Sequence, residues 1–339
     1  MYIDVIKNRV FLYAIALFIT IFALFSIFFI KLNYGIDMTG GIQLEYSYEK
    51  QIDIENIRSK VEEESKNLLY QGKNIVNAAH TYKISGEDKF SVVVWFNQAD
   101  VPEKDLEGLK NTFKTELLSL LTKENPSIKE YQYINIGKSF WDYIRNTALL
   151  TLAISLIGIA IYIAYAFSWF VWGINAFSFG AVTIITLFHD VLVAFWLYIF
   201  VSLFYKEFQI DTFTITALLT ILGYSINDTI IVFDRVRTNL KRSIGKNKKK
   251  LAEIIDDSVN QTLLRSIYTS LTLFLVLVAI FFFGPTAIKG FILVMIFGTL
   301  VGTYSSIFIA APMLYDINKN KDLKPIEEKV YNPDDKIVV

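Results

Sequence analysis

The sequence predicts an α-helical membrane protein whose six spanning helices carry one α+β domain outside the membrane. Of its 339 residues, 53% are apolar and only 19% are charged, whereas about 25% are charged in an average soluble domain. A spanning helix needs about 20 mostly apolar residues. The segments that meet this requirement are residues 10–30, 148–167, 180–204, 212–234, 266–283 and 291–315.

The first apolar segment, residues 10–30, is interpreted as an uncleaved anchor, because its apolar core is long and no small-residue cleavage site follows it. Lys7 and Arg9 precede it, and the densest basic run, DRVRTNLKRSIGKNKKK, separates the fourth and fifth segments. Basic loops stay on the cytoplasmic side of a membrane. We therefore expect a multi-pass protein of the cytoplasmic (inner) membrane, with a cytoplasmic N-terminus at 1–9 and a cytoplasmic C-terminal tail at 316–339.

Residues 31–145 are polar again, and we expect them to form an extracytoplasmic domain. The stretches IQLEYSY, NIVNAAHTYKI, KFSVVVWF and SIKEYQYINI look like strands. Two stretches between them, DIENIRSKVEEESKNLLYQ and PEKDLEGLKNTFKTELLSLLTK, have helical spacing. The resulting order is β-α-β-β-α-β, which predicts a ferredoxin-like domain.

The other five spans lie within residues 146–315, and the fourth span of the chain, residues 212–234, carries a polar face. The residues on this face follow helical spacing, and they are Thr216, Thr220, Tyr224, Asn227 and Asp228. Polar groups at the depth of the hydrocarbon face a bundle interior or a wet cavity rather than lipid. We therefore expect this face to point into the bundle or into a wet cavity, away from lipid.

Two further ionisable side chains are predicted near the depth of Asp228, namely Asp190 in the third span and Arg265 at the start of the fifth. The functional interpretation of this layer is a proton relay, in which Asp228 takes up a proton from the outer face and releases it inward. Arg265, Asp190, His189 and Asn227 are its other candidate members. The structural alternative is a static buried ion pair that orients the helices. His189 is equally typical of a hydrogen bond between helices.

The sixth span carries small residues at four-residue steps, which predicts close helix packing. They are Gly298, Gly302, Ser306 and Ala310. The absence of cysteine excludes disulfides and thiolate chemistry, and two histidines argue against a histidine-rich metal site. With a formal net charge of zero, nothing indicates a nucleic-acid partner. We expect no metal and no cofactor, with protons as the coupling ion.

Five motifs of the chain together resemble the SecF family. They are YGIDMTGGIQLEY after the first span, LFHDVLVAF in the third, LTILGYSINDTIIVFDRVRTNL in the fourth, SVNQTLLRSIYTSLT into the fifth and GTYSSIFIAAPML in the sixth. SecF is the smaller subunit of the SecD–SecF protein-export membrane complex. The resemblance implies that the six spans form one half of an RND-type transporter and that SecD supplies the other half.

The resemblance also implies a function and a set of partners. The complex is expected to use the proton-motive force to promote the export of unfolded preproteins through SecYEG, and it is not an enzyme. SecD, SecYEG, SecA and YajC are then the expected protein partners, together with preprotein substrates and membrane lipid.

Residue by residue, Asp228 matches the family's essential span-four aspartate, and Arg265 matches the arginine of its proton path. Asp37, Gly40 and Gly41 match the family's first motif, whose glycines we expect to make a tight exit from the first span. Gly223 belongs to the span-four motif as a structural residue.

The chain departs from the family just before the second span. There NIGKSFWDY keeps Gly137 but lacks the usual proline and second glycine, so the hinge geometry at this point stays open.

Three other functions compete with this one. A structural assembly subunit of the translocon would carry the same buried charges without proton coupling. An intramembrane aspartyl protease would use Asp190 and Asp228 as a dyad, but its Gly-x-Gly-Asp motif is missing and a nearby arginine would keep a carboxylate ionised. A small-molecule RND exporter would need a much longer chain with larger outer domains.

Overall fold

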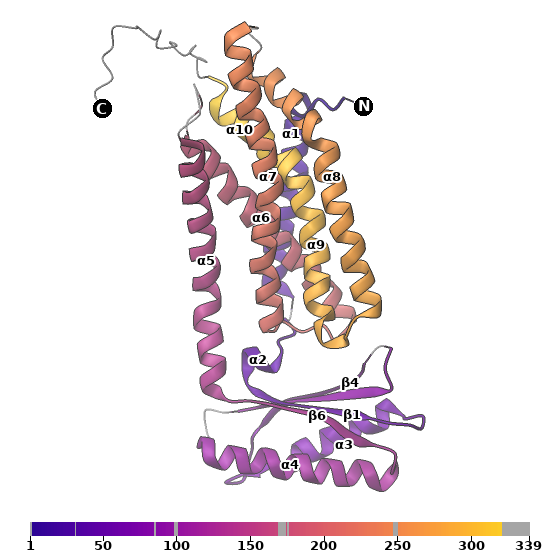
Figure 1. The fold of residues 1–339 in the computed structure, drawn as a ribbon. Helices are drawn as coiled ribbons and strands as arrows, with labels where there is room; N and C mark the ends of the chain where they lie inside the picture. The colour runs from indigo at the N-terminus through magenta and orange to yellow at the C-terminus, as the bar shows by residue number, and fades with distance from the viewer. Residues whose placement is uncertain are drawn as a thin grey trace, which may run out of the picture.

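The computed structural model describes residues 2–30, 32–84, 86–97, 101–168, 174, 176–246 and 250–320. They form a helical bundle and, beyond one end of it, a smaller domain built on a β-sheet, here called the sheet domain (Figure 1). Most of the predicted C-terminal tail, residues 321–339, lies outside the described residues, as do residues 247–249 of the basic run.

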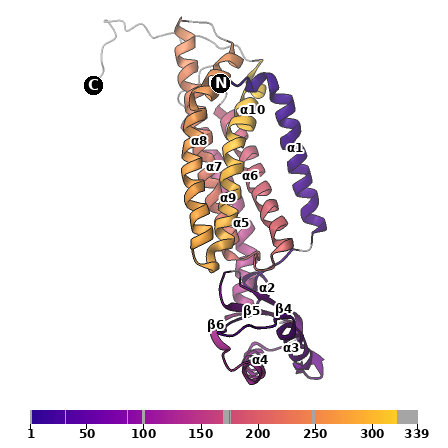
Figure 2. The same ribbon diagram turned by 90° about the vertical axis from the view of Figure 1, so that its right-hand side faces the viewer.

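The bundle contains, among the described residues, six helical segments that are long and apolar enough to cross a membrane. The first five are α1 (Val5–Phe29), α5 (Lys138–Ser168), α6 (Ala176–Phe204), α7 (Thr212–Lys246) and α8 (Leu251–Phe283). The sixth joins η1 (Thr286–Ile288), α9 (Lys289–Ser305), the π-helical turn η2 (Ser306–Ala310) and α10 (Ala311–Asn318). Figure 2 shows α1 along one edge of the bundle, where it lies against α6.

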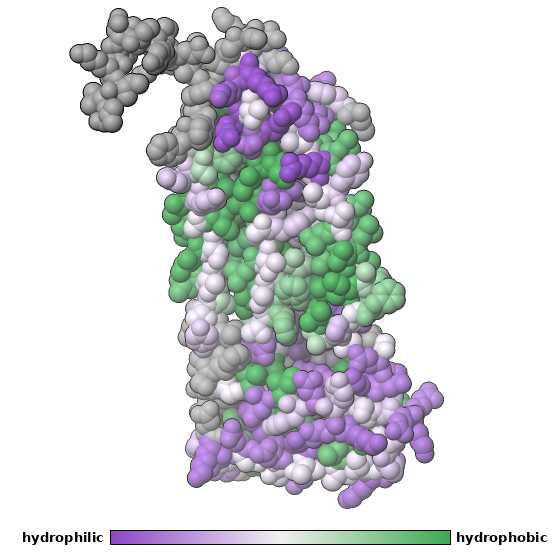
Figure 3. All heavy atoms as spheres, in the orientation of Figure 1, coloured by the Kyte–Doolittle hydropathy of each residue, from purple (hydrophilic) through white to green (hydrophobic). Residues whose placement is uncertain are grey.

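On the face drawn in Figure 3, an apolar belt covers the middle of the bundle, and polar side chains cover the sheet domain and the opposite end. Large apolar side chains such as Phe18, Ile161 and Phe282 are more than half exposed on this belt. A soluble protein rarely exposes a continuous apolar surface of this extent. The belt therefore fits a lipid environment, as the composition predicted.

Several helices are longer than the apolar segments that predicted them. The helix α7 continues past residue 234 to Lys246, and α8 begins at Leu251, well before residue 266. These extensions are amphipathic, so they do not contain the long apolar run by which the spans were predicted. They are held together by side chains, because Arg235 Nε and Asn239 Nδ2 both donate to Gln261 Oε1, at 2.5 and 3.0 Å.

The sheet domain has the strand and helix order that the sequence predicted, with one short hairpin added. Its elements are β1 (Gly41–Ser47), α3 (Ile54–Asn67), the hairpin β2 (Leu69–Tyr70) and β3 (Lys73–Asn74), β4 (Val76–Lys83), β5 (Lys89–Phe96), α4 (Glu103–Glu124) and β6 (Lys129–Ile136). The four long strands form an antiparallel sheet in the order β4-β5-β1-β6. The helices α3 and α4 lie on the same face of this sheet, away from the bundle (Figure 1). Buried residues such as Leu44, Phe90 and Phe113 form the core between them.

Two short connections attach the sheet domain to the bundle. On one side, the short helix α2 (Ile36–Thr39) and Gly40 lead into β1, and on the other only Gly137 separates β6 from α5. A parallel bridge also joins Tyr34 to Ile210 in the α6–α7 loop. The chain therefore leaves the first span through a short helix, and the glycines make the turn after this helix rather than directly after α1.

Candidate functional site

Asp228 lies inside the bundle on α7, with its side chain buried. The hydroxyl of Ser270 on α8 donates to Asp228 Oδ2 at 3.3 Å, whereas Asp228 Oδ1 has no hydrogen-bond partner. Ser270 in turn accepts from the hydroxyls of Tyr224, at 2.9 Å, and Thr303 on α9, at 2.6 Å. Ser270 thus links α7, α8 and α9 at Asp228. The Oδ1 atom of Asp228 remains without a hydrogen-bond partner.

Asp190 on α6 has a closed set of partners instead. Its Oδ2 accepts from Ser225 Oγ at 2.5 Å and from Ser305 Oγ at 2.7 Å. His189 Nδ1 lies 2.9 Å from Asp190 Oδ1, and its Nε2 lies 2.7 Å from the hydroxyl of Tyr304. The neutral tautomer with its proton on Nδ1 satisfies both contacts. Both oxygens of Asp190 are therefore occupied within the chain.

The two carboxylates lie at similar depth but belong to separate hydrogen-bond networks. Ser225, which bonds Asp190, is three residues from Asp228 on α7, a rise of about 4.5 Å along the helix. On α9, Thr303 belongs to the Asp228 network and its neighbour Tyr304 to the Asp190 network. In the described residues, each carboxylate has its own set of side-chain partners, and no hydrogen bond joins the two carboxylates directly.

Within this single chain, only part of the polar face of α7 points into the bundle. Asp228 is buried, but Thr216, Thr220 and Asn227 are exposed on the surface of this single chain. The reason is angular: at 3.6 residues per turn, residues at positions i and i+1 differ by about 100° around the helix. Asn227, Thr220 and Thr216 therefore face outward, while Asp228 faces α8.

Arg265 on α8 is also exposed, on the face that includes Thr269 and Thr272. Within the described part of the chain, Arg265 and Asp228 form no ion pair within 4 Å. The two exposed polar faces of α7 and α8 lie within the apolar span of each helix. Arginine, threonine and asparagine are costly against lipid, so such a surface is typical of one that a protein partner covers.

The glycines of these helices divide between the inside and the outside of the bundle. A Cβ on Gly298 would clash with the side chain of Ile221, and one on Gly302 would lie 2.9 Å from Ser225 Cβ, so α9 packs directly against α7 at both positions. Gly223 is exposed, and a Cβ there would meet nothing within 4 Å. Because glycine has no side chain, the exposed face of α7 is flat at Gly223, and we call this position the flat point.

The other small residues of the sixth span lie in or beside the π-helical turn η2. Ser306 Oγ lies 2.9 Å from Thr229 Oγ1 on α7, and Ala310 is fully buried. π-Helical turns inside α-helices are frequent at functional sites. This turn follows Thr303, Tyr304 and Ser305, which contact the two networks.

The glycine motif lies at the end of the bundle next to the sheet domain. Asp37 Oδ2 accepts from Thr212 Oγ1 at 2.5 Å and from the Thr212 backbone N–H at 3.4 Å, at the first residue of α7. Gly40 and Gly41 have φ angles of 73° and 149°, and a Cβ on Gly41 would clash with the carbonyl oxygen of Val94. The motif thus fixes the start of the helix that carries Asp228.

Sequence reasoning missed the hydroxyl groups that hold the carboxylates. Ser225, Ser270 and Ser305 lie on different helices, and their contacts depend on how those helices pack. It also missed Asp256 on α8, whose Oδ1 accepts from the backbone N–H groups of Val5 and Ile6 at 2.9 and 3.0 Å and so caps α1. A helical spacing of serines on α8, at 266 and 270, was the one available signal.

Two family models match the chain. The C-terminal model of the protein export membrane proteins SecD/SecF matches residues 116–320, and the SecD/SecF GG motif matches residues 25–52. The protein translocase subunit SecF of Sebaldella termitidis is 34% identical over 327 residues, which cover 96% of this chain and 95% of that protein. SecF of Thermodesulfovibrio yellowstonii is 34% identical over 311 residues, which cover 91% and 92%.

Among solved structures, the chain resembles SecDF, a translocon-associated membrane protein from Thermus, with a TM-score of 0.74 and 27% identity. The match covers 94% of this chain and 39% of the SecDF chain, so the chain spans about two fifths of that protein's length. A second SecDF structure, in a super-membrane-facing form, matches with a TM-score of 0.59. The chain therefore belongs to the SecF family of protein translocase subunits.

Proposed function

We propose that this chain works with SecD as one half of an RND-type membrane complex that uses the proton-motive force. The complex promotes the export of unfolded preproteins through SecYEG and has no enzymatic activity of its own. Protons are its coupling ion, and it needs no other cofactor. SecA, YajC and membrane lipid are its further proposed contacts.

We place the chain in the inner membrane with both termini in the cytoplasm. The sheet domain then lies on the outer face, where its strand order, β4-β5-β1-β6, supports the ferredoxin-like assignment. The basic run at the other end of the bundle supports the same orientation, because basic loops remain cytoplasmic.

The observation that carries proton coupling is the unpartnered oxygen of Asp228. A buried carboxylate without a complete set of partners is expensive in a membrane and usually functional. Its partners in the chain are neutral hydroxyls, and Asn227 and Arg265 lie on the adjoining exposed surface. We assign Asp228 to proton transfer, Arg265 and Asn227 to the path beside it, and the closed His189–Asp190 network to positioning α6.

The exposed polar surface of α7 and α8 supports SecD as the partner. A second helical bundle placed there would cover Arg265 and Asn227 and close the path around Asp228. The flat point at Gly223 would allow a partner helix to approach closely. The SecDF chain from Thermus, of which this chain matches 39%, has the additional length for such a bundle.

The test is preprotein export in cells that carry the matching SecD, measured with and without a proton-motive force. Asp228→Asn keeps the size of the side chain and its hydrogen bond to Ser270 but cannot carry the proton. We expect the complex to assemble normally while the proton-dependent part of export is lost. Asp234→Asn, an exposed carboxylate further along α7, is the matched control. Export that stays proton-dependent in Asp228→Asn would favour a structural assembly subunit.

A further inference from the structure

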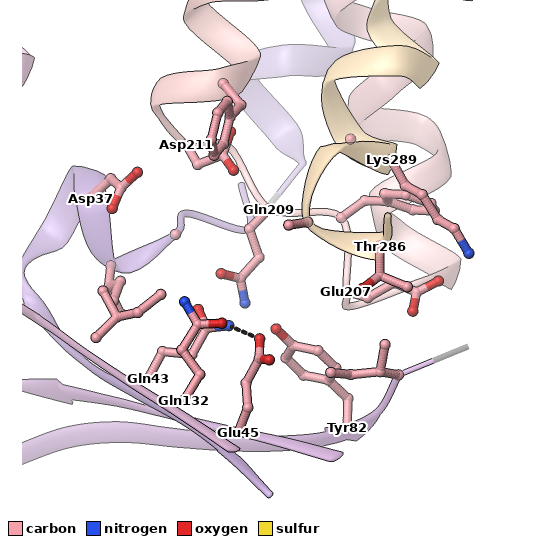
Figure 4. A pocket seen from close by; sticks show the side chains of 18 of the residues that line it. Asp37, Gln43, Glu45, Tyr82, Gln132, Glu207, Gln209, Asp211, Thr286 and Lys289 are labelled. Atoms are coloured by element: carbon pink, nitrogen blue, oxygen red, sulfur yellow. Dashed lines mark hydrogen bonds between the residues drawn. The ribbon is translucent and has the colours of Figure 1, made fainter. Parts of the chain in front are cut away.

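A cavity of about 190 Å³ lies between the sheet domain and the end of the bundle (Figure 4). We call it the junction cavity. The open face of the sheet contributes Gln43, Glu45 and Gln132, and the α6–α7 loop contributes Gln209 and Asp211, with Asp37 of α2 beside them. The cavity is far from Asp228, and the proposed proton path does not use it.

Carboxylates without a matching cation dominate this cavity. Asp37 accepts from Thr212, Glu45 accepts from Gln43 at 3.0 Å, and Asp211 accepts from Thr214 at the start of α7. None of the three forms an ion pair with a lysine or arginine in the part of the chain that the structure describes. Their hydrogen-bond donors are neutral, so the cavity keeps a net negative charge.

Two lysines lie near the cavity but do not neutralise it. Lys289 lines the cavity, but Figure 4 shows its ammonium turned away from Glu45 and Gln209. Lys89 forms an ion pair with Glu87 at 2.6 Å. Burial raises the pKa of Glu45 and of Asp211 above their ordinary values, and at Glu45 the charge of Lys89 offsets only part of this rise.

Gln209 provides a second and independent indication of a ligand. Its side chain is 8% exposed and points into the cavity between Gln132 and Glu45 (Figure 4), and its Nε2 has no hydrogen-bond partner. The residue is held in place, because its backbone oxygen accepts from the hydroxyl of Tyr198 at 2.7 Å. An unpaired buried amide is destabilising, and an acceptor on a ligand would satisfy it.

We propose that the junction cavity binds a basic side chain of an extended polypeptide that is not part of this chain. The ammonium or guanidinium group lies against Glu45, Asp37 and Asp211. Gln209 Nε2 donates to a carbonyl oxygen of the same polypeptide. This proposal does not depend on proton transfer at Asp228.

Size and chemistry favour a polypeptide over other cations. The cavity is smaller than the roughly 300–1,000 Å³ of pockets for drug-sized ligands, and it suits a single long side chain. The amides of Gln43 and Gln209 each offer a donor and an acceptor, which match the N–H and C=O groups of a peptide. Within the described residues, no group of three histidine, aspartate or glutamate side chains has a geometry that holds a metal ion.

The lack of cysteine in the chain allows a direct test with single-cysteine variants of the detergent-solubilised full chain. Gln132→Cys places the thiol at the exposed edge of the cavity, and Ser59→Cys places it on the exposed side of α3. The measured quantity is the rate of thiol labelling by a methanethiosulfonate reagent. The probes are the capped peptides acetyl-Gly-Arg-Gly-amide and acetyl-Gly-Gln-Gly-amide.

We expect the arginine peptide to slow the labelling of Gln132→Cys in a saturable way and to leave Ser59→Cys unchanged. The glutamine peptide should protect neither thiol. Adding Glu45→Gln should weaken the protection at least about tenfold, because a buried charge pair loses one partner, and Gln209→Ala should weaken it too. Glu62→Gln, an exposed carboxylate on α3, is the control and should leave protection intact.

Three results would overturn the proposal. One is equal protection by the two peptides, and another is protection that Glu45→Gln leaves unchanged. The third is protection by free spermidine but not by the arginine peptide, which would assign the cavity to a small polyamine. Unchanged protease resistance of each variant verifies that the sheet domain is folded.

Discussion

Ser270 donates its hydroxyl to Asp228 across the α7–α8 contact, whereas Ser266, one turn earlier on the same helix, has a buried hydroxyl without a partner. Two serines on one face of α8 thus have opposite roles. Ser270 connects Tyr224 and Thr303 to the carboxylate, and Ser266 connects nothing within the described residues. The pair separates the effect of a hydrogen bond from the effect of a buried hydroxyl.

Ser270→Ala should lower the free energy of unfolding by about 1–3 kcal/mol, because Tyr224 loses its acceptor and Asp228 its donor, while Thr303 keeps the Thr299 carbonyl oxygen as an acceptor. Ser266→Ala should be neutral or stabilising, because it removes a buried polar group that has no partner. Thermal unfolding of the two variants in the same detergent checks both values. Equal losses in the two variants would show that the Ser270 contacts contribute nothing specific.

The closed network around Asp190 should contribute more to stability than Asp228 does. Asp190→Ala leaves Ser225 and His189 without an acceptor and removes one of the two acceptors of Ser305, so we expect a loss of at least about 3 kcal/mol. Tyr304→Phe removes only the outermost contact of this network and should cost about 1 kcal/mol. Unfolding temperatures and yields of folded protein provide the comparison. The assignment of Asp190 to positioning would be wrong if Asp190→Ala were as stable as wild type.

Gly41 and Gly86 both have positive φ angles, of 149° and 82°, but only Gly41 lacks space for a side chain. Gly41→Ala should therefore cost about 3 kcal/mol or more, from backbone strain and the clash with the Val94 carbonyl. Gly86→Ala meets no atom within 4 Å and should cost about 1 kcal/mol. Protease resistance of the sheet domain in the full chain measures the difference. Similar resistance of the two variants would contradict a special role for Gly41.

The raised pKa of Glu45 has a consequence for the pH dependence of stability. The folded chain holds a proton on Glu45 above its ordinary pKa of 4.5, where the unfolded chain has released it. Stability therefore falls as the pH rises from 4.5 through the raised pKa. Glu45→Gln should flatten this slope and be more stable than wild type at neutral pH.

Unfolding temperatures measured from about pH 4 to about pH 8 check this slope. Glu62→Gln, whose carboxylate is exposed on α3, should keep the wild-type slope. A slope that is as steep in Glu45→Gln as in wild type would mean that other carboxylates determine it.

The sequence predicted the helices and the strand order well, because apolar length and strand alternation are properties of local stretches. Asp228 was also found from the sequence, since a carboxylate inside an apolar run is visible without a fold. The orientation of its helix was not predictable in the same way. Whether Asn227 faces the bundle or a partner depends on an angular step of about 100° and on the packing of α8.

The hydrogen-bond networks and the junction cavity were beyond sequence reasoning for a related reason. Ser225, Ser270 and Tyr304 are common hydroxyl residues, and they matter only because three helices bring them together. The junction cavity joins residues near positions 40, 132, 209 and 289, and no local pattern connects those segments. The hairpin β2–β3, whose turn includes Gln71 at a φ of 50°, was not predicted. Its first residues looked like the last turn of the helix that precedes it.

The attachment of β1 and β6 gives the sheet domain a particular mechanical character. These two strands are neighbours in the sheet and pair antiparallel, and each leads almost directly into a bundle helix, β1 through α2 to α1 and β6 to α5. Gly41 and Ile136, the two strand residues nearest the bundle, are register partners at the same end of this ladder. A movement that separates α1 from α5 therefore pulls the two strands apart from that end. Such a load acts on the hydrogen bonds one after another, beginning at the Gly41–Ile136 pair, so the ladder would peel open from the bundle side instead of resisting as a stiff link.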